Sequence, residues 1–127
     1  MLIIGTGIDI AAIARFERFV NEDNQSLFRR LFTQLELDYC FAKRFAAQPL
    51  ALRFAAKEAF LKALGTGLRD GISWLEIEIR NDELGKPHLS VSGRAAVQLA
   101  TAGADKSHLS LSDDGGFAIA MVILEGR

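Results

Sequence analysis

Two acidic side chains stand where an ionised carboxylate is costly, and this placement makes them candidates for chemistry. Asp9 follows the apolar run 2–8 and lies between Ile8 and Ile10, whereas Glu58 lies in a stretch of Ala, Phe and Leu. A carboxylate in such surroundings needs a cation or hydrogen-bond donors. Mg²⁺ prefers oxygen ligands and usually takes one or two protein carboxylates together with water and substrate phosphates. Asp9 and Glu58 are therefore candidate metal ligands.

Each candidate also has a purely structural interpretation. Glu58 and Lys62 stand four residues apart in the favourable order for a helical ion pair, and spacing alone favours that pair over a metal site. Asp9 could equally cap the helix that follows it. Lys57 and Arg53 are either further cations for phosphates or part of a solvated helix face, and spacing favours the solvated face.

The helix that carries Glu58 has clear signals at both ends. Pro49 is suited to the first helical position, where its missing N–H would be unpaired in any case. Gly65 is a natural stop after Leu64. The loop Gly65-Thr66-Gly67 is too short to bind phosphate by itself, and a glycine C-cap followed by a turn explains it.

The remaining sequence patterns predict a single α+β domain over residues 1–127, with a largely antiparallel sheet packed on helices. The sheet is expected to be antiparallel because short turns join the paired strands. Thr33 and Glu36 have the spacing of a capping box, which should open a helix running to about residue 45. The other expected elements are a strand at 2–8, a helix from Ile13 that carries Arg15 and Arg18, a helical segment at 27–32, strands at 74–79 and 88–91, a helix at 93–102, and strands at 108–112 and 117–124.

Composition limits the classes of partner and compartment. Fifteen Lys and Arg oppose sixteen Asp and Glu, so the net charge of −1 predicts no general attraction to nucleic acid or to a lipid surface. No apolar run approaches the roughly 20 residues of a membrane span. The single cysteine, Cys40, cannot form an intrachain disulfide, which fits a cytoplasmic protein. We expect Cys40 to be a packed or half-exposed thiol and not a nucleophile, and His88 and His108 lack metal-ligand spacing.

Three stretches together resemble the acyl-carrier-protein synthase family of 4'-phosphopantetheinyl transferases. They are Gly5-Thr6-Gly7-Ile8-Asp9-Ile10, the long block from Arg53 to Gly67 that includes Lys57-Glu58, and Asn81-Asp82-Glu83-Leu84-Gly85-Lys86-Pro87. The similarity continues through His108-Leu109-Ser110-Leu111-Ser112 and the last strand, so it covers essentially the whole chain.

The resemblance implies a reaction and roles for the candidate residues. Asp9 and Glu58 would hold Mg²⁺ against the pyrophosphate of coenzyme A, and Lys62 would contact the phosphates. A serine hydroxyl of apo acyl carrier protein would attack the phosphorus that bears the pantetheine arm, releasing 3',5'-ADP. Its proton would pass to Glu58 or to metal-bound water, and the sequence leaves both open. The implied neighbours of coenzyme A are Arg53, Lys62, Gly65 and Gly67.

The resemblance also implies an assembly and a partner surface. Similar proteins form homotrimers with coenzyme A at the subunit interfaces, and their place in metabolism is fatty acid biosynthesis. Arg15 and Arg18 match the family's docking surface for the acidic helix of the carrier protein. Asp113 stands where many members have a histidine near the nucleotide, which puts the nucleotide contacts on that side in question.

Two other functions are consistent with the same residues. A metal-dependent nucleotide phosphohydrolase would use the two carboxylates to activate water instead of a serine hydroxyl. A non-catalytic binding module would have retained the fold without the reaction, although Asp9, Glu58 and Lys62 are all present.

Overall fold

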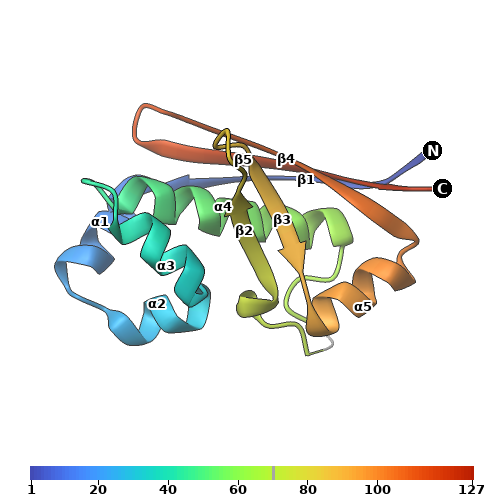
Figure 1. The fold of residues 1–127 in the computed structure, drawn as a ribbon, viewed down its shortest axis with the longest axis horizontal. Coiled ribbons are helices and arrows are strands. Elements are labelled where there is room, and N and C mark those ends of the chain that lie inside the picture. The colour runs from blue at the N-terminus through green and yellow to red at the C-terminus, as the bar shows by residue number, and fades with distance from the viewer. Residues whose placement is uncertain (70) are drawn as a thin grey trace.

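The fold consists of a long central helix packed on an antiparallel sheet, with smaller elements around both (Figure 1). The structure is a computed structural model that describes residues 1–69 and 71–127. Its elements are β1 (Leu2–Ala12), α1 (Ile13–Asn21), α2 (Gln25–Leu31), α3 (Gln34–Phe41), α4 (Ala47–Leu64), the 3₁₀ turn η1 (Trp74–Glu76), β2 (Ile77–Asn81), β3 (Pro87–Val91), α5 (Gly93–Thr101), β4 (Ala104–Asp114) and β5 (Phe117–Gly126).

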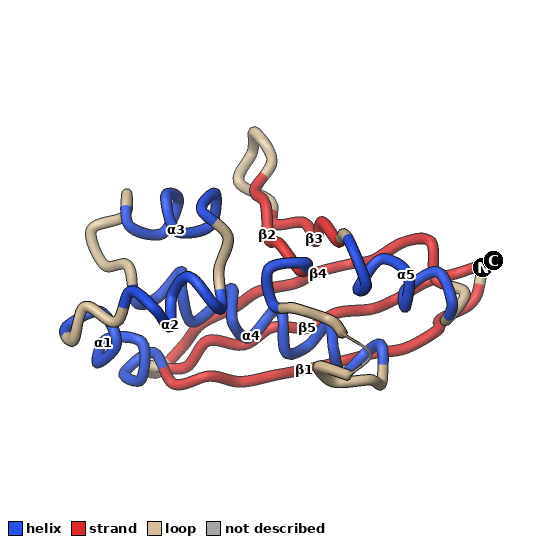
Figure 2. The backbone as a smooth tube through the Cα atoms, turned by 90° about the horizontal axis from the view of Figure 1, so that it is seen from below, coloured by secondary structure: helices blue, strands red, loops and turns tan. Residues whose placement is uncertain are grey.

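The main sheet has the order β1-β5-β4, and both of its strand pairs are antiparallel. A second, two-stranded antiparallel sheet is formed by β2 and β3. Figure 2 shows α4 running along the main sheet, with α1, α2 and α3 gathered at one end of the molecule and α5 at the other. The expected α+β class, with antiparallel strands packed on helices, is confirmed.

The central helix is buried on most of its surface. Leu50, Ala55, Ala59 and Phe60 of α4 are fully buried, which explains why this helix lacks a polar face. One core cluster joins α4 to the main sheet and to β2, and a second joins α4 to α1, α2 and α3. Helix α4 is therefore the common wall of both cores.

Two glycines let β1 approach α4 at backbone distance. A Cβ atom built on Gly7 would lie 1.9 Å from the carbonyl oxygen of Ala59, and one on Gly5 would lie 2.0 Å from that of Ala63. No side chain fits at either position without moving the strand away from the helix. The glycines that interrupt the first strand thus determine how closely β1 packs against α4.

Several element ends differ from the sequence-based expectation. The strand predicted at 2–8 continues to Ala12, because its whole length pairs with β5. Helix α3 ends at Phe41 instead of about 45, and α4 begins two residues before Pro49. A proline in the third helical position is still tolerated, since none of the first four N–H groups has an intrahelical partner. The strand expected from residue 74 begins with the turn η1, so strand pairing starts at Ile77.

The helices lie on one side of the main sheet (Figure 1), and β1 and β5 expose apolar side chains on its other side. Along β5, Ala118, Ala120, Val122 and Leu124 are fully buried, and the alternate residues face the opposite way. Ile8, Ile10, Phe117 and Met121 are each more than 40% exposed. We call this surface, formed by Ile8, Ile10, Phe117, Ile119, Met121 and Ile123, the outer sheet face.

We expect Gly7→Ala to lower the free energy of unfolding by about 1–3 kcal/mol or more, because the new methyl group would overlap the Ala59 carbonyl. Urea denaturation measures this loss. Thr6→Ala is the matched control, since Thr6 is exposed in the same strand, and it should change stability by less than about 1 kcal/mol. Equal stability of the two variants would contradict the close packing of β1 on α4.

Candidate active site

The close packing of β1 on α4 brings Asp9 and Lys62 together across 53 residues of sequence. The Lys62 Nζ atom donates to Asp9 Oδ1 at 2.9 Å and to the carbonyl oxygen of Ile8 at 3.0 Å. The Asp9 side chain is only 15% exposed, whereas that of Lys62 is 53% exposed. The ammonium group therefore compensates a largely buried carboxylate and remains open to solvent.

Glu58 lies beside this pair and is in an unfavourable electrostatic position. Burial, and then the negative charge of Asp9, raise the pKa of the Glu58 carboxyl above its ordinary value. The positive charges of Lys62 and Arg15 oppose this change without cancelling it. Two nearby carboxylates with too little positive charge around them form a site that favours an additional cation.

A cavity of about 470 Å³ opens at these residues. Gly65 ends α4 in the left-handed conformation with φ of 82°, and Gly67 follows with φ of 61°. A Cβ atom at either glycine would meet no atom within 4 Å, so both leave the backbone of this wall open to a ligand. The lining residues are Glu58, Leu61, Lys62, Gly65, Gly67, Leu68 and Trp74.

The structural alternatives for the two acids are wrong. Asp9 lies within β1 and pairs with Ala120, and the N-cap of α1 is Ala12, so Asp9 does not cap that helix. Among the described residues Glu58 forms no ion pair with Lys62, whose ammonium group is directed to Asp9. The preferred interpretation of the Glu58–Lys62 spacing fails because β1 places the Asp9 carboxylate within hydrogen-bonding distance of Lys62.

Both interpretations of Lys57 are also wrong. Lys57 is completely buried, so it is neither part of a solvated face nor a cation available to phosphates. Its Nζ atom lies 2.7 Å from the equally buried Glu36 Oε1. Glu36 and Thr33 form the capping box expected from the sequence, but the ion pair with Lys57 was not predicted. A lysine inside the Ala- and Leu-rich stretch of α4 was the available signal.

Arg53 does not line the cavity that contains Glu58. Its side chain is buried, its guanidinium lies 4.0 Å from the Tyr39 ring centroid, and its Nη2 donates to Asn81 Oδ1 at 2.5 Å. The Arg53 Nε atom is buried without a hydrogen-bond partner. Arg53 lines a separate cavity of about 410 Å³ whose other walls include Asn81, Lys86 and Leu111.

Arg15 and Arg18 are both exposed on α1, on the side away from the buried Phe16, as expected. Their surroundings differ. The Arg15 guanidinium lies 5.0 Å from the Phe54 ring centroid, and its charge lowers the pKa of Glu58. Arg18 forms an exposed ion pair with Glu22 at 3.5 Å. Arg15 thus links the surface of α1 to the cavity region.

Three other polar residues take no part in the Glu58 cavity. Cys40 is completely buried, so of the two expected states the thiol is packed and not half-exposed, and burial raises its pKa to about 12. Each histidine has its own acidic neighbour: His88 lies 3.2 Å from Asp82, and His108 lies 3.3 Å from Glu125. Within residues 1–69 and 71–127, no group of three or more His, Cys, Asp or Glu side chains forms a candidate metal site.

Asp113 is exposed near the end of β4 and accepts a hydrogen bond from Gln48 Nε2 at 3.2 Å. Gln48 lies at the start of α4 and lines the Arg53 cavity. The aspartate at position 113, where many family members have a histidine, therefore lies near the Arg53 cavity and not at the cavity that contains Glu58.

Fold and site together define a small α+β protein with two carboxylates and a lysine at the edge of an open cavity. Comparison with known proteins assigns this class. The 4'-phosphopantetheinyl transferase superfamily matches residues 5–122, and the chain belongs to that family.

Relatives with known names agree over nearly the full length. The chain is 59% identical to the holo-acyl-carrier-protein synthase of Geotalea daltonii over 124 residues, covering 98% of this chain and 99% of the relative. It is 60% identical to that of Trichlorobacter lovleyi, with 98% of each chain covered.

Solved structures match as well. The holo-acyl-carrier-protein synthase of Neisseria meningitidis superimposes with a TM-score of 0.87 at 36% identity, covering 98% of this chain and 99% of the other. That of Bacillus anthracis, solved in complex with CoA (3',5'-ADP), superimposes with a TM-score of 0.80 at 36% identity and covers 100% of both chains.

We expect Glu58→Gln to raise the thermal unfolding midpoint at pH 7, without divalent metal, by a few degrees. The pKa of Glu58 is raised in the folded protein, so ionising this carboxyl disfavours folding above the ordinary glutamate pKa of about 4.3. The gain should therefore shrink as the pH falls from 7 toward 4. Calorimetry across this range tests it, with the exposed Glu83→Gln as control. A variant no more stable than wild type at pH 7 would contradict the electrostatic description.

Proposed function

We propose that this protein transfers the 4'-phosphopantetheine group of coenzyme A to a serine of apo acyl carrier protein. The observation that carries the proposal is the meeting of Asp9, Glu58 and Lys62 beside one open cavity, in a chain that belongs to the phosphopantetheinyl transferase superfamily. A phosphate-bearing substrate needs positive charge, and an attacking hydroxyl needs an acceptor for its proton. Lys62 and Glu58 supply these two groups side by side.

The carboxylates fit a divalent cation. Asp9 and Glu58 provide two hard oxygen donors, and burial and the nearby charge of Asp9 raise the pKa of Glu58. With only two protein ligands, the remaining positions suit water and substrate phosphates, as is usual for Mg²⁺. When bound, Mg²⁺ neutralises charge on the phosphates and the leaving oxygen.

The chain's own residues then have distinct roles. The Lys62 ammonium group, half-exposed at the cavity, binds a phosphate oxygen. The carboxylate of Glu58 accepts the serine proton. The serine oxygen forms the new bond to the phosphorus that bears pantetheine, the bond to the 5'-phosphate of the nucleotide breaks, and 3',5'-ADP leaves. Gly65 and Gly67 allow the substrate to approach the backbone.

Mass spectrometry of apo acyl carrier protein, incubated with this protein, coenzyme A and Mg²⁺, tests the reaction directly. We expect a gain of one phosphopantetheine per carrier protein, and a loss of rate of at least about a hundredfold in Asp9→Ala and in Glu58→Ala, which corresponds to roughly 2.7 kcal/mol. Both variants should keep the wild-type circular dichroism spectrum. Release of 3',5'-ADP without the carrier protein would instead favour a phosphohydrolase, and binding without either product would favour a non-catalytic module.

A homotrimer with sites at its subunit interfaces is the second part of the proposal. Arg53 and Glu58 are five residues apart on α4, so their side chains project about 140° apart around the helix axis. The unpartnered Nε of Arg53 and the surrounding cavity are suited to a phosphate or a nucleotide base, but they face away from the Glu58 cavity. Contact between two copies of the chain can bring one subunit's Glu58 cavity to its neighbour's Arg53 cavity.

The outer sheet face supports the same assembly. Ile8 pairs with Met121 and Ile10 pairs with Ile119, so these side chains form a continuous apolar surface. Covering such an apolar surface lowers the free energy of the protein in water. Copies of this chain are the proposed cover, because equivalent sheet faces can close around a threefold axis.

Light scattering at micromolar concentration should give the mass of three chains. Ile10→Lys should shift the protein to a monomer, because the ammonium group would be buried in the interface, and transfer activity should fall with it. The exposed Leu84→Lys, in the loop between β2 and β3, is the control and should remain trimeric. A fully active wild-type monomer would refute the shared site.

Carrier-protein docking on α1 is the third part of the proposal. Arg15 and Arg18 stand one turn apart and are exposed, and the contact of Arg15 with Phe54 places the docking surface next to the cavity. An acidic helix bound there would bring its serine toward Glu58. The proposal includes a place in fatty acid biosynthesis and a cytoplasmic location, where coenzyme A and carrier protein occur together. No helix in the described part of the chain has the length and apolarity needed to cross a membrane.

The double variant Arg15→Glu/Arg18→Glu should raise the KM for carrier protein by at least about tenfold, while the KM for coenzyme A changes much less. Added salt should weaken the wild-type interaction, since exposed charges are screened over about 10 Å at 0.1 M. Arg29→Glu/Arg30→Glu on α2 is the matched control with the same charge change. If the control raises the KM and the α1 variant does not, docking lies on α2.

A further inference from the structure

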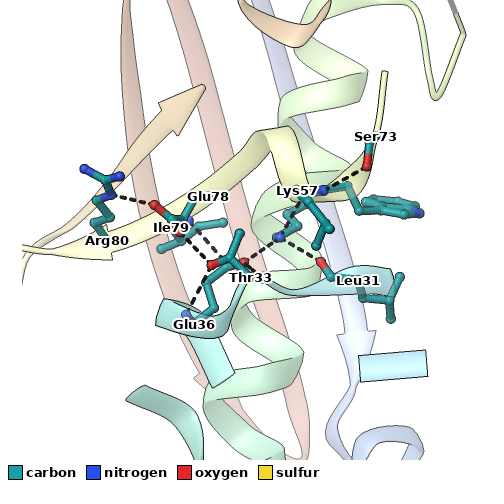
Figure 3. A network of polar contacts seen from close by, with 10 residues as sticks. Leu31, Thr33, Glu36, Lys57, Ser73, Glu78, Ile79 and Arg80 are labelled. Atoms are coloured by element: carbon teal, nitrogen blue, oxygen red, sulfur yellow. Dashed lines mark hydrogen bonds and ion pairs between the residues drawn. The ribbon is translucent and has the colours of Figure 1, made fainter. Parts of the chain in front are cut away.

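The buried ion pair of Lys57 and Glu36 connects four separate segments of the chain (Figure 3). Lys57 Nζ donates to Glu36 Oε1 and to the Leu31 carbonyl oxygen, both at 2.7 Å, and to the Trp74 carbonyl oxygen at 3.1 Å. Glu36 also accepts from the backbone N–H of Thr33 and of Ile79, each at 3.0 Å. The end of α2, the start of α3, the middle of α4, and the segment formed by η1 and β2 are thereby held at one point.

One of these bonds reaches the wall of the candidate active site. Trp74 lines the same cavity as Glu58 and Lys62. Its ring lies 5.3 Å from that of Phe54, and its backbone carbonyl is held by Lys57. Lys57 and Glu58 are adjacent in α4. The same helical turn therefore carries the lysine that holds the Trp74 backbone and the carboxylate that lines the cavity.

The contact also fixes where the loop after α4 returns to the protein. This loop leaves α4 at Gly65, lines the cavity with Gly67 and Leu68, and rejoins the protein at η1. At the return point, Ser73 and Glu76 form a capping box, and Glu76 accepts from the Arg94 backbone N–H at 2.9 Å. Lys57 holds the backbone of the return point to α4, beside the ring contact between Trp74 and Phe54 of the same helix.

We propose that Lys57 is a positioning residue: by holding the carbonyl of Trp74 it fixes the indole ring as a wall of the Glu58 cavity and so determines how tightly the cavity binds coenzyme A. The substrate in this statement rests on the proposed function. The position of Trp74 does not, because it can be measured without a reaction.

The appropriate comparison is between wild type and the double variant Glu36→Gln/Lys57→Met. Either substitution alone would leave one buried charge without its partner, which is strongly destabilising. Glutamine keeps an oxygen that can accept a backbone N–H, and methionine has nearly the length of lysine without the ammonium group. The double variant therefore lacks the Lys57 contacts and leaves no buried charge unpaired.

Trp74 is the only tryptophan in the chain, so its fluorescence reports directly on this wall. Without any ligand, we expect the double variant to show red-shifted emission relative to wild type, with at least about twofold greater quenching by acrylamide. In steady-state kinetics, the double variant should raise the KM for coenzyme A by about tenfold over wild type and change kcat by less than about threefold, as expected for lost substrate binding. Identical fluorescence and KM in wild type and the folded double variant would overturn the proposal.

A second variant keeps the test decisive if the double variant does not fold. Trp74→Ala removes the indole and leaves the carbonyl that Lys57 holds, so it should raise the KM for coenzyme A to a similar extent, and Trp74→Phe should raise it less. A wild-type KM in Trp74→Ala would overturn the proposal. Absence of transfer by wild type would contradict the proposed function, while the ligand-free fluorescence comparison would still decide whether Lys57 positions Trp74.

Discussion

The close contact between β1 and α4 is the constraint on which the site depends. Gly5 and Gly7 leave no room for a side chain between the strand and the carbonyl groups of Ala63 and Ala59. With the backbones this close, Asp9 of the strand reaches Lys62 of the helix and lies near enough to Glu58 to raise its pKa. A larger residue in either glycine position would separate the two halves of the site as well as loosen the core.

Helix α4 uses two lysines, five residues apart, in opposite ways. Lys57 points into the protein, where burial lowers the pKa of its ammonium group and the Glu36 carboxylate opposes that change. Its three acceptors satisfy all three of its N–H groups, so it works as a structural tie. Lys62 points to the cavity and is half-exposed, so its charge can reach a ligand. In the roles proposed above, their different burial separates positioning by Lys57 from phosphate binding by Lys62.

The site residues fall into two groups that one copy of the chain does not bring together. Glu58 and Lys62 line one cavity, with Asp9 paired to Lys62, whereas Arg53, Asn81 and Lys86 line another. The apolar outer sheet face gives a physical reason for copies to associate, and association offers a way to unite the cavities. In the proposed assembly, residues from two copies of the chain would together form one extended nucleotide site.

Local signals in the sequence determined most of the elements and the identity of the acidic residues. The capping box at Thr33 and Glu36, the stop at Gly65, and the antiparallel pairs were predicted because they depend on neighbouring residues. Asp9 and Glu58 stood out because charge is costly beside apolar residues. Only the tertiary structure decided that Lys62 binds Asp9 in place of Glu58, that Lys57 is buried against Glu36, and that Trp74 forms a cavity wall. These contacts join residues 17 to 53 positions apart, and their geometry depends on how β1, α3 and η1 pack on α4, which spacing within one element does not encode.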